Sequence, residues 1–230
     1  MMTKEASEME DEIKNAMGER NEPQQPEPKI KDPNIKLFNR WSMAELSVPD
    51  PGLASIMNID PIIVPRTGGK HATTYLHKSK VNIVERLINK MMIPGHRGRK
   101  HKYTSDNAPA STQAIMKALI KAFEIIEQRT KKNPVQVLID AVCNAAVNEE
   151  IAAYRMGGTI ARQAVTTSPR RRLDLSLRHL SQGIYKMKFN NKNPLPNIIA
   201  DELMAAATSD PKSFSIQERN RMEKEAEGAR

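Results

Sequence analysis

A glycine pair at residues 157–158 separates two short runs, 151–156 and 159–165, that have the character of strands. A tight two-residue hairpin turn requires positive φ, which glycine adopts without steric cost. The sequence therefore predicts a two-stranded β-ribbon at residues 150–166.

A helix with a strongly basic first turn is predicted directly after this ribbon. Ser168 and Pro169 fit an N-cap followed by a first-turn proline. Three consecutive arginines come next, and an apolar face then follows at helical spacing: Leu173, Leu177, Leu180 and Ile184. Because a helix N-terminus carries partial positive charge, each arginine there costs roughly a few tenths of a kcal/mol unless an anion lies opposite. The pattern favours contact with phosphates, and the alternative is a solvated charge run.

The positive charge of the chain is unevenly distributed. The net charge is +9, although residues 1–30 hold four Lys/Arg and eight Asp/Glu. Segment 66–102 holds ten basic residues and one acidic residue, and segment 155–192 holds nine and one. Clusters of this kind indicate a polyanionic partner.

The periodicity predicts a mainly α fold: a single helical domain of about six helices, a two-stranded β-ribbon and an extended N-terminal arm. Residues 1–35 form the acidic extended or disordered arm, 36–78 a proline-rich strap and basic loop, and 79–230 the helical domain, which we expect to bind RNA. Within the strap, residues 41–46 form at most a short helix.

Individual helix boundaries follow from local signals. Helices are expected at 79–93, 112–131 and 134–147, after the ribbon, from about Pro194, and from Ser215 to the end. Asn133 is the expected N-cap of the third helix and Gln136 its capping-box partner, and the run from Ser215 to Glu218 resembles a second capping box. In the first helix, Arg86 is expected to lie outside the buried stripe.

Several classes of function are disfavoured. The single cysteine, Cys143, excludes an intrachain disulfide and indicates a reducing compartment, and no apolar run reaches the ~18 residues that span a bilayer. The Gly-Gly-Lys at 68–70 lacks the spacing of a phosphate-binding loop, and the five histidines form no metal motif. We therefore expect a cytoplasmic protein that is not an enzyme and needs no metal or cofactor.

Four segments in order resemble the universal small-subunit ribosomal protein seven family: INKMM (88–92), NPVQVLIDAVCNAA (133–146), MGGTIARQAV with SPRRR (156–172), and ADELMAAA (200–207). The stretches VPRTGGKHA (64–72) and KSKVNIVERL (78–87) are similar to its archaeal and eukaryotic branch. The ribbon departs from the family pattern by opening with Asn148-Glu149-Glu150, and the loop after the first helix is longer.

The resemblance implies a helical domain with a protruding β-ribbon, which binds the 3′ major domain of small-subunit rRNA and nucleates assembly of the head. It also implies a place in the small ribosomal subunit near neighbouring head and platform proteins, the exit-site tRNA and the mRNA exit channel. A basic helical DNA-binding protein is the alternative, although no recognition helix or dimer signal is visible.

A-form RNA is held mostly through phosphates, 2′-hydroxyls and shape, and arginine suits phosphate especially well. Tyr103 and Tyr154 are candidates for stacking on bases, although a packed state is favoured for Tyr154. The expected RNA-binding residues are Lys78, Lys80, Lys90, Arg97, Arg99, Lys100, Lys102, Arg155, Arg162, Arg170, Arg171, Arg172 and Arg178.

Overall fold

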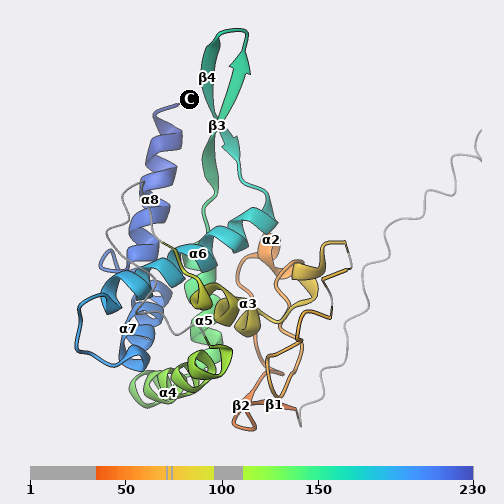
Figure 1. Ribbon diagram of the computed structural model, residues 1–230, viewed down its shortest axis with the longest axis vertical. Coiled ribbons are helices and arrows are strands. Elements are labelled where there is room, and N and C mark those ends of the chain that lie inside the picture. Colours follow the sequence, from red (N-terminus) through yellow and green to blue (C-terminus); the bar gives the residue numbers. More distant parts are fainter. Residues whose placement is uncertain (1–34, 71, 74, 96–110, 230) are drawn as a thin grey trace, which may run out of the picture. The chain divides into compact units, whose positions relative to one another are not determined.

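The structure is a computed structural model that describes residues 35–95, except 71 and 74, and residues 111–229 (Figure 1). The chain divides into two compact units, residues 1–31 and 32–230. The elements below belong to the second unit. The acidic arm up to residue 34 lies outside the described residues, and so do Arg97, Arg99, Lys100, Lys102 and Tyr103.

The described residues confirm the mainly α fold. In chain order the elements are β1 (Lys36–Leu37), β2 (Trp41–Ser42), α2 (Pro51–Ala54), the 3₁₀ helix η1 (His77–Lys80), α3 (Ile83–Met92), α4 (Thr112–Thr130), α5 (Pro134–Asn144), β3 (Glu149–Met156), β4 (Thr159–Thr166), α6 (Pro169–Lys188), α7 (Leu195–Ala207) and α8 (Phe214–Glu227). The helices from α3 to α8 are the six that the sequence predicts. The short helix α2 has no counterpart among the predicted helices.

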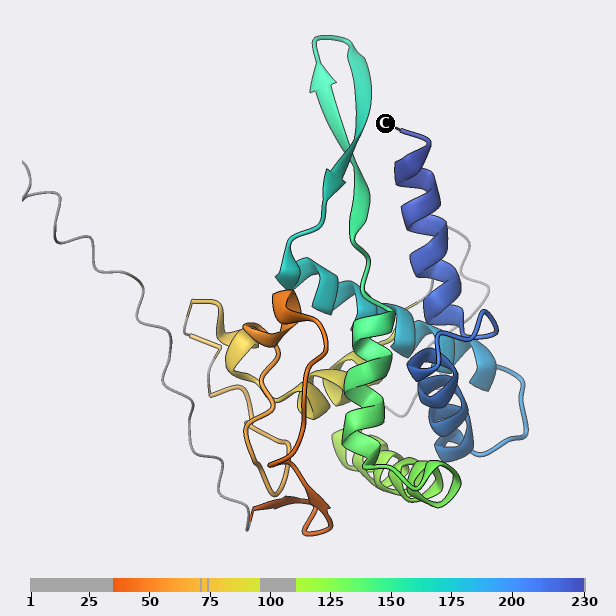
Figure 2. The same cartoon turned by 180° about the vertical axis from the view of Figure 1, so that it is seen from behind.

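Helix α6 is enclosed by its neighbours. It packs against α2, α3, α5, α7 and α8, and it can be followed through the middle of the helices in Figures 1 and 2. The predicted apolar face is buried, and so are Ser176 and Ser181, whose hydroxyls donate to the α6 carbonyls of Leu173 and Arg178. Each fully buried leucine contributes about 1.5–3 kcal/mol, so tertiary burial stabilises α6 more than helix propensity does.

The prediction of a short helix at residues 41–46 is wrong. Strands β1 and β2 form a small antiparallel hairpin in which Leu37 pairs with Trp41. Phe38 and Asn39 make the turn with φ of 52° and 59°. The Trp41 ring packs edge-on against Phe123 of α4, with 5.4 Å between the ring centroids. This hairpin depends on a partner some 80 residues away in the chain, which a local pattern does not reveal.

The expected N-cap of α5 is confirmed, because the Asn133 side chain accepts a hydrogen bond from Val135 N at 3.0 Å. The expected capping-box role of Gln136 is wrong, because its side chain binds Ser47 and Asp140 instead. The predicted capping box of α8 is wrong by two residues: Ser213 is the N-cap, and Ser215 lies inside the first turn. Both serines bind the buried carboxylate of Glu202, through Ser213 Oγ at 2.8 Å and Ser215 N at 3.2 Å. Burial raises the pKa of Glu202, and these hydrogen bonds oppose the increase.

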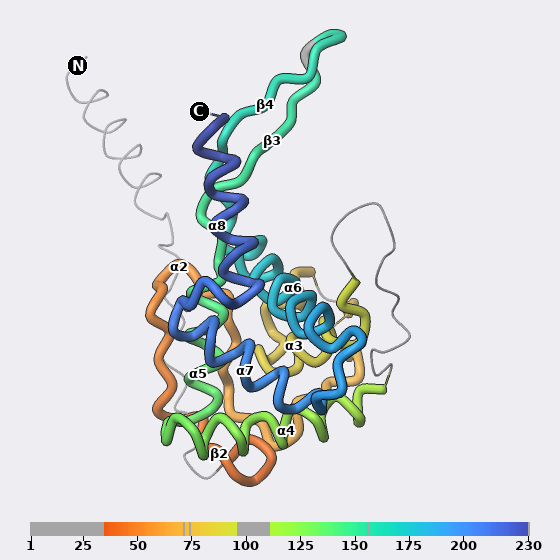
Figure 3. The backbone as a smooth tube through the Cα atoms, turned by 90° about the vertical axis from the view of Figure 1, so that its left-hand side faces the viewer, coloured from red at the N-terminus to blue at the C-terminus, as the bar shows by residue number. Residues whose placement is uncertain are grey.

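The β-ribbon occupies almost the predicted range. Its register runs from Glu149 opposite Thr166 to Met156 opposite Thr159. Only Gly157 of the glycine pair adopts positive φ, at 60°, as in hairpin turns that place glycine at the first central position. Figure 3 shows the ribbon extending away from the helices with α8 beside its base, where Asn148 N donates to Glu223 Oε1 at 3.0 Å.

We expect Gly183→Ala to destabilise the protein by about 1–3 kcal/mol, because overpacking a close contact forces neighbours to move. A Cβ at Gly183 would lie 3.0 Å from Glu202 Oε1 and 3.0 Å from Phe214 Cβ, where α6 meets α7 and α8. Urea unfolding measures the change. Gly158→Ala is the matched control, since nothing lies within 4 Å of its added Cβ; equal stability of the two variants would contradict the tight contact at Gly183.

Candidate nucleic-acid interface

Five of the predicted RNA-binding residues line one hollow of about 310 Å³, which we call the cationic groove: Lys78, Lys90, Arg170, Arg171 and Arg178. Ser168, Asp174 and Leu175 complete its lining. The residues come from η1, α3 and α6. The two basic windows of the sequence, 66–102 and 155–192, therefore meet at this groove because α3 packs against α6.

Asp174 organises the groove. Its Oδ1 accepts a hydrogen bond from Arg86 Nη2 at 3.0 Å, and its Oδ2 lies 3.9 Å from Lys78 Nζ. Arg170, Asp174 and Arg178 are four residues apart and so share one face of α6. The carboxylate therefore holds cations from η1 and α3 beside the face of α6 that carries Arg170 and Arg178.

The expected exposed position of Arg86 is wrong, because its residue is only 6% exposed and its side chain reaches from α3 to α6. Neither Arg86 nor Asp174 is among the residues that the sequence predicts for this surface. One signal is nevertheless present: Asp174 is the only acidic residue in the basic window 155–192. Its partner cannot be inferred from the sequence, since the two residues are 88 positions apart.

The groove is electrostatically suited to an anion. Burial lowers the pKa of Lys90, the nearby cations Arg178, Lys78 and Arg86 lower it further, and Asp174 opposes the decrease. An anion bound beside Lys90 would favour its charged form and raise the pKa again. The single carboxylate of Asp174 does not balance the five cationic side chains of the groove, so the groove keeps a net positive charge.

Two of the three first-turn arginines of α6 have anionic partners within the chain. Arg171 forms an ion pair with Glu150 of β3, and this hydrogen bond raises the pKa of Arg171. Arg172 donates to Asp50 Oδ2 and to Asn148 Oδ1, each at 2.7 Å, and its side chain is only 16% exposed. These contacts explain much of the unusual basic helix start, and they tie α6 to the cap of α2 and to the base of the ribbon.

Arg170 differs from its two neighbours. Its side chain is half-buried in the cationic groove, and no ion pair to it is found among the described residues. Arg178, two turns further along α6, is exposed and equally without an ion pair in the described part of the chain. These two arginines are therefore the members of α6 best placed to meet an external anion.

The remaining predicted residues lie away from the groove. Lys80 is exposed at the end of η1. Arg155 and Arg162 are exposed on the ribbon, and the register places both side chains on one face together with Ile160. Tyr154 lies on the opposite face and is 48% exposed, so the favoured packed state is wrong.

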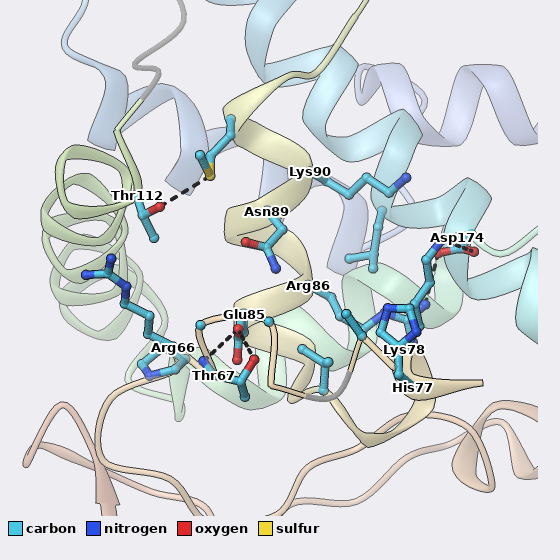
Figure 4. Close-up of a pocket in the computed structure, with 17 residues that line it drawn as sticks. Arg66, Thr67, His77, Lys78, Glu85, Arg86, Asn89, Lys90, Thr112 and Asp174 are labelled. Carbon is cyan, nitrogen blue, oxygen red and sulfur yellow. Dashed lines mark hydrogen bonds and ion pairs between the residues drawn. The ribbon is translucent and has the colours of Figure 1, made fainter. Parts of the chain in front are cut away.

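A second, larger hollow adjoins the cationic groove and shares Lys78, Lys90 and Asp174 with it (Figure 4). We call this hollow of about 570 Å³ the loop chamber. Its walls come from residues 65–69 and Ala72, from η1 and α3, and from Thr112 and Leu177. The sequence of this loop does not predict the hollow, since its Gly-Gly-Lys lacks the spacing of a phosphate-binding motif.

The loop chamber keeps its shape through Glu85 of α3. Its Oε1 accepts hydrogen bonds from Thr67 N and Thr67 Oγ1, both at 2.8 Å (Figure 4). Gly68 and Gly69 follow with φ of 63° and 78°, values that favour glycine. Gly68 and Gly69 therefore allow a turn directly after Thr67, which is hydrogen-bonded to the buried carboxylate of Glu85.

Two other kinds of site are not found among the described residues. No group of three or more His, Cys, Asp or Glu side chains in this part of the chain could hold a metal ion. Among the helices that the structure describes, none has the length and apolar character needed to cross a membrane.

Fold and charge together define a helical protein with a concave cationic surface, an arrangement suited to a phosphate-rich partner. Residues 60–230 match the family model described as "Ribosomal protein S7p/S5e". The chain is 38% identical over 196 residues to the small ribosomal subunit protein uS7 of Nanoarchaeum equitans, covering 85% of this chain and 99% of that protein.

Two further relatives bear the same name. The chain is 40% identical over 195 residues to the protein of Methanococcoides burtonii, and 40% identical over 196 residues to that of Archaeoglobus fulgidus. These alignments cover 85% of this chain and 99% and 95% of the relatives. The chain therefore belongs to the S7p/S5e family of small-subunit ribosomal proteins, which confirms the resemblance seen in its sequence.

Arg172 and Arg178 lie on the same helix but should respond differently to replacement by alanine. We expect Arg172→Ala to lower the free energy of unfolding by about 1–3 kcal/mol, because it leaves Asp50 and Asn148 without their partner. Arg178→Ala should change stability by less than about 0.5 kcal/mol, since its side chain is exposed. Chemical denaturation of both variants tests this, and a stable Arg172 variant would show that the bridge contributes little.

Proposed function

We propose that this chain is a structural, RNA-binding component of the small ribosomal subunit, where it binds the 3′ major domain of the rRNA and nucleates assembly of the head. The observation that carries the proposal is the convergence of cations from η1, α3 and α6 on the cationic groove. Family membership supplies the class of RNA, since the relatives are named small ribosomal subunit proteins.

The proposed mode of binding is neutralisation of phosphates by a preformed surface. Arg170 and Arg178 supply planar guanidinium groups without ion pairs in the described chain, and Lys90 supplies an ammonium group whose pKa is lowered by burial and by neighbouring cations. Such contacts fix position and orientation on RNA without a chemical step. The proposed role is therefore not enzymatic and requires no cofactor.

The β-ribbon is the second part of the proposal. It carries Arg155 and Arg162 on one face and half-exposed Tyr154 on the other, so both faces offer groups that contact nucleic acid. We assign it contacts with the exit-site tRNA and the mRNA exit channel. The helices and the N-terminal arm would meet neighbouring head and platform proteins, in a cytoplasmic ribosome.

Binding to a 3′ major domain fragment of archaeal small-subunit rRNA, compared with duplex DNA of equal charge across a salt series, tests the rRNA assignment. We expect much tighter binding to the RNA at physiological salt. Replacing Arg170 and Arg178 with alanine should reduce the salt slope by about 0.7–0.9 for each phosphate that is no longer neutralised. Equal affinity for RNA and DNA would favour the alternative of a basic helical DNA-binding protein.

The ribbon can be tested separately from the helices. Deleting residues 154–161 and joining Ala153 to Arg162, which face each other in the register, through an Asn-Gly turn should leave a short hairpin. We expect unchanged helical circular dichroism and unchanged affinity for the rRNA fragment, but impaired translation by ribosomes that contain the variant. Loss of the helical signal would show instead that the ribbon is needed for folding.

A further inference from the structure

We propose that the loop chamber accepts the base of a single unpaired nucleotide, extruded from the rRNA whose phosphates lie in the cationic groove. This inference rests on the proposed RNA-binding function and specifies the form of RNA that is bound. Its starting observation is that the two hollows are adjacent and differ in chemistry, while sharing Lys78, Lys90 and Asp174.

The cationic groove is the more strongly cationic of the two hollows. Five cationic side chains surround it, and Asp174 is the only acidic group among the described residues that line it. The loop chamber contains a second carboxylate, Glu85, and its walls include the apolar residues Pro65, Val81, Met92 and Leu177. Four cationic residues, Arg66, Lys78, Arg86 and Lys90, face these two carboxylates, so the chamber is less positive than the groove. A phosphate placed there would lie beside Glu85 and would gain nothing from the apolar walls.

A nucleobase fits these conditions better than a phosphate does. It has an apolar face for the walls and an edge that carries both hydrogen-bond donors and acceptors. The chamber volume of about 570 Å³ lies within the range of roughly 300–1,000 Å³ that is typical of ligand pockets. A fully paired A-form helix would present phosphates to the groove and leave the chamber unused.

Buried polar atoms give independent support. Glu85 and Arg86 line the chamber and are only 5% and 6% exposed. Glu85 Oε2 and Arg86 Nη1 are buried without a hydrogen-bond partner in the described chain, although Oε1 and Nη2 of the same residues are both engaged. Such atoms are costly unless they find partners. A base edge offers a donor for the carboxylate oxygen and an acceptor for the guanidinium nitrogen, and it would reach these buried atoms after the two side chains turn toward the chamber.

The geometry also explains how one nucleotide would span both hollows. Lys78 and Lys90 lie at the shared boundary, where the phosphate and ribose of an extruded nucleotide would pass from the groove to the chamber (Figure 4). Asp174 orients Lys78 and Arg86 at this boundary. The chamber would therefore recognise an unpaired position in the RNA, and the groove would bind the adjacent backbone.

The test fills the chamber without changing its charge. Asn89 is an exposed residue of α3 that lines the chamber (Figure 4), and Asn89→Trp would occupy the space proposed for the base. Ala72→Trp fills it from the opposite loop. Gln128→Trp is the matched control, because Gln128 is also exposed on a helix but lies on α4 outside both hollows.

The probe is the archaeal 3′ major domain rRNA fragment, with base-specific chemical modification of unpaired nucleotides. The unmodified protein should protect at least one unpaired base, and this base should regain reactivity in both chamber-filling variants. Their dissociation constants should rise about tenfold or more, as expected when one base is no longer bound. The Gln128 variant should behave like the unmodified protein.

The inference is overturned if the chamber-filling variants bind as tightly as the control and no base regains reactivity. It is also overturned if they weaken binding to a fully paired RNA hairpin by the same factor, because the chamber would then contact duplex. Failure of the unmodified protein to prefer the rRNA fragment to DNA is a different result, which would overturn the proposed function itself.

Discussion

The Arg86–Asp174 ion pair, with a Nη2–Oδ1 distance of 3.0 Å, is the interaction on which the candidate interface depends. It joins α3 to α6 at a point where both helices also bring cations to the surface. Arg86 is buried, so loss of Asp174 would leave a charge without compensation, which is far more costly than loss of an exposed pair. The same carboxylate sets the boundary between the cationic groove and the loop chamber.

A second constraint is the start of α6, where three arginines oppose the helix dipole. Asp50 and Glu150 neutralise two of them from the strap and the ribbon, so these charges hold parts of the chain together. Arg170 remains for an external anion. One basic sequence motif thus divides into structural and binding roles, and an anionic partner within the chain is the property that separates them: Arg171 pairs with Glu150 and Arg172 with Asp50, whereas no ion pair to Arg170 is found among the described residues.

The predictions that succeeded rest on interactions between residues close together in the sequence. The six long helices and the ribbon were predictable because their apolar periodicity, prolines, Asn133 cap and glycine pair act within a few residues. The errors at residues 41–46 and at the start of α8 originate in contacts with other elements. Trp41 forms a strand because its ring packs against Phe123. Ser213 caps α8, and both Ser213 Oγ and Ser215 N donate hydrogen bonds to the buried carboxylate of Glu202.

The sequence by itself determined the helical class, the ribbon, the excess of positive charge and the resemblance to a ribosomal protein family. Only the tertiary structure decided which cations meet, because Asp50 and Arg172 are 122 residues apart and no periodicity connects them. It also revealed the loop chamber, since this concave surface is lined by residues 65–69 and Ala72 together with residues of η1, α3 and α6. Charge is a property of the residues, whereas a site requires residues from separate elements to be held together.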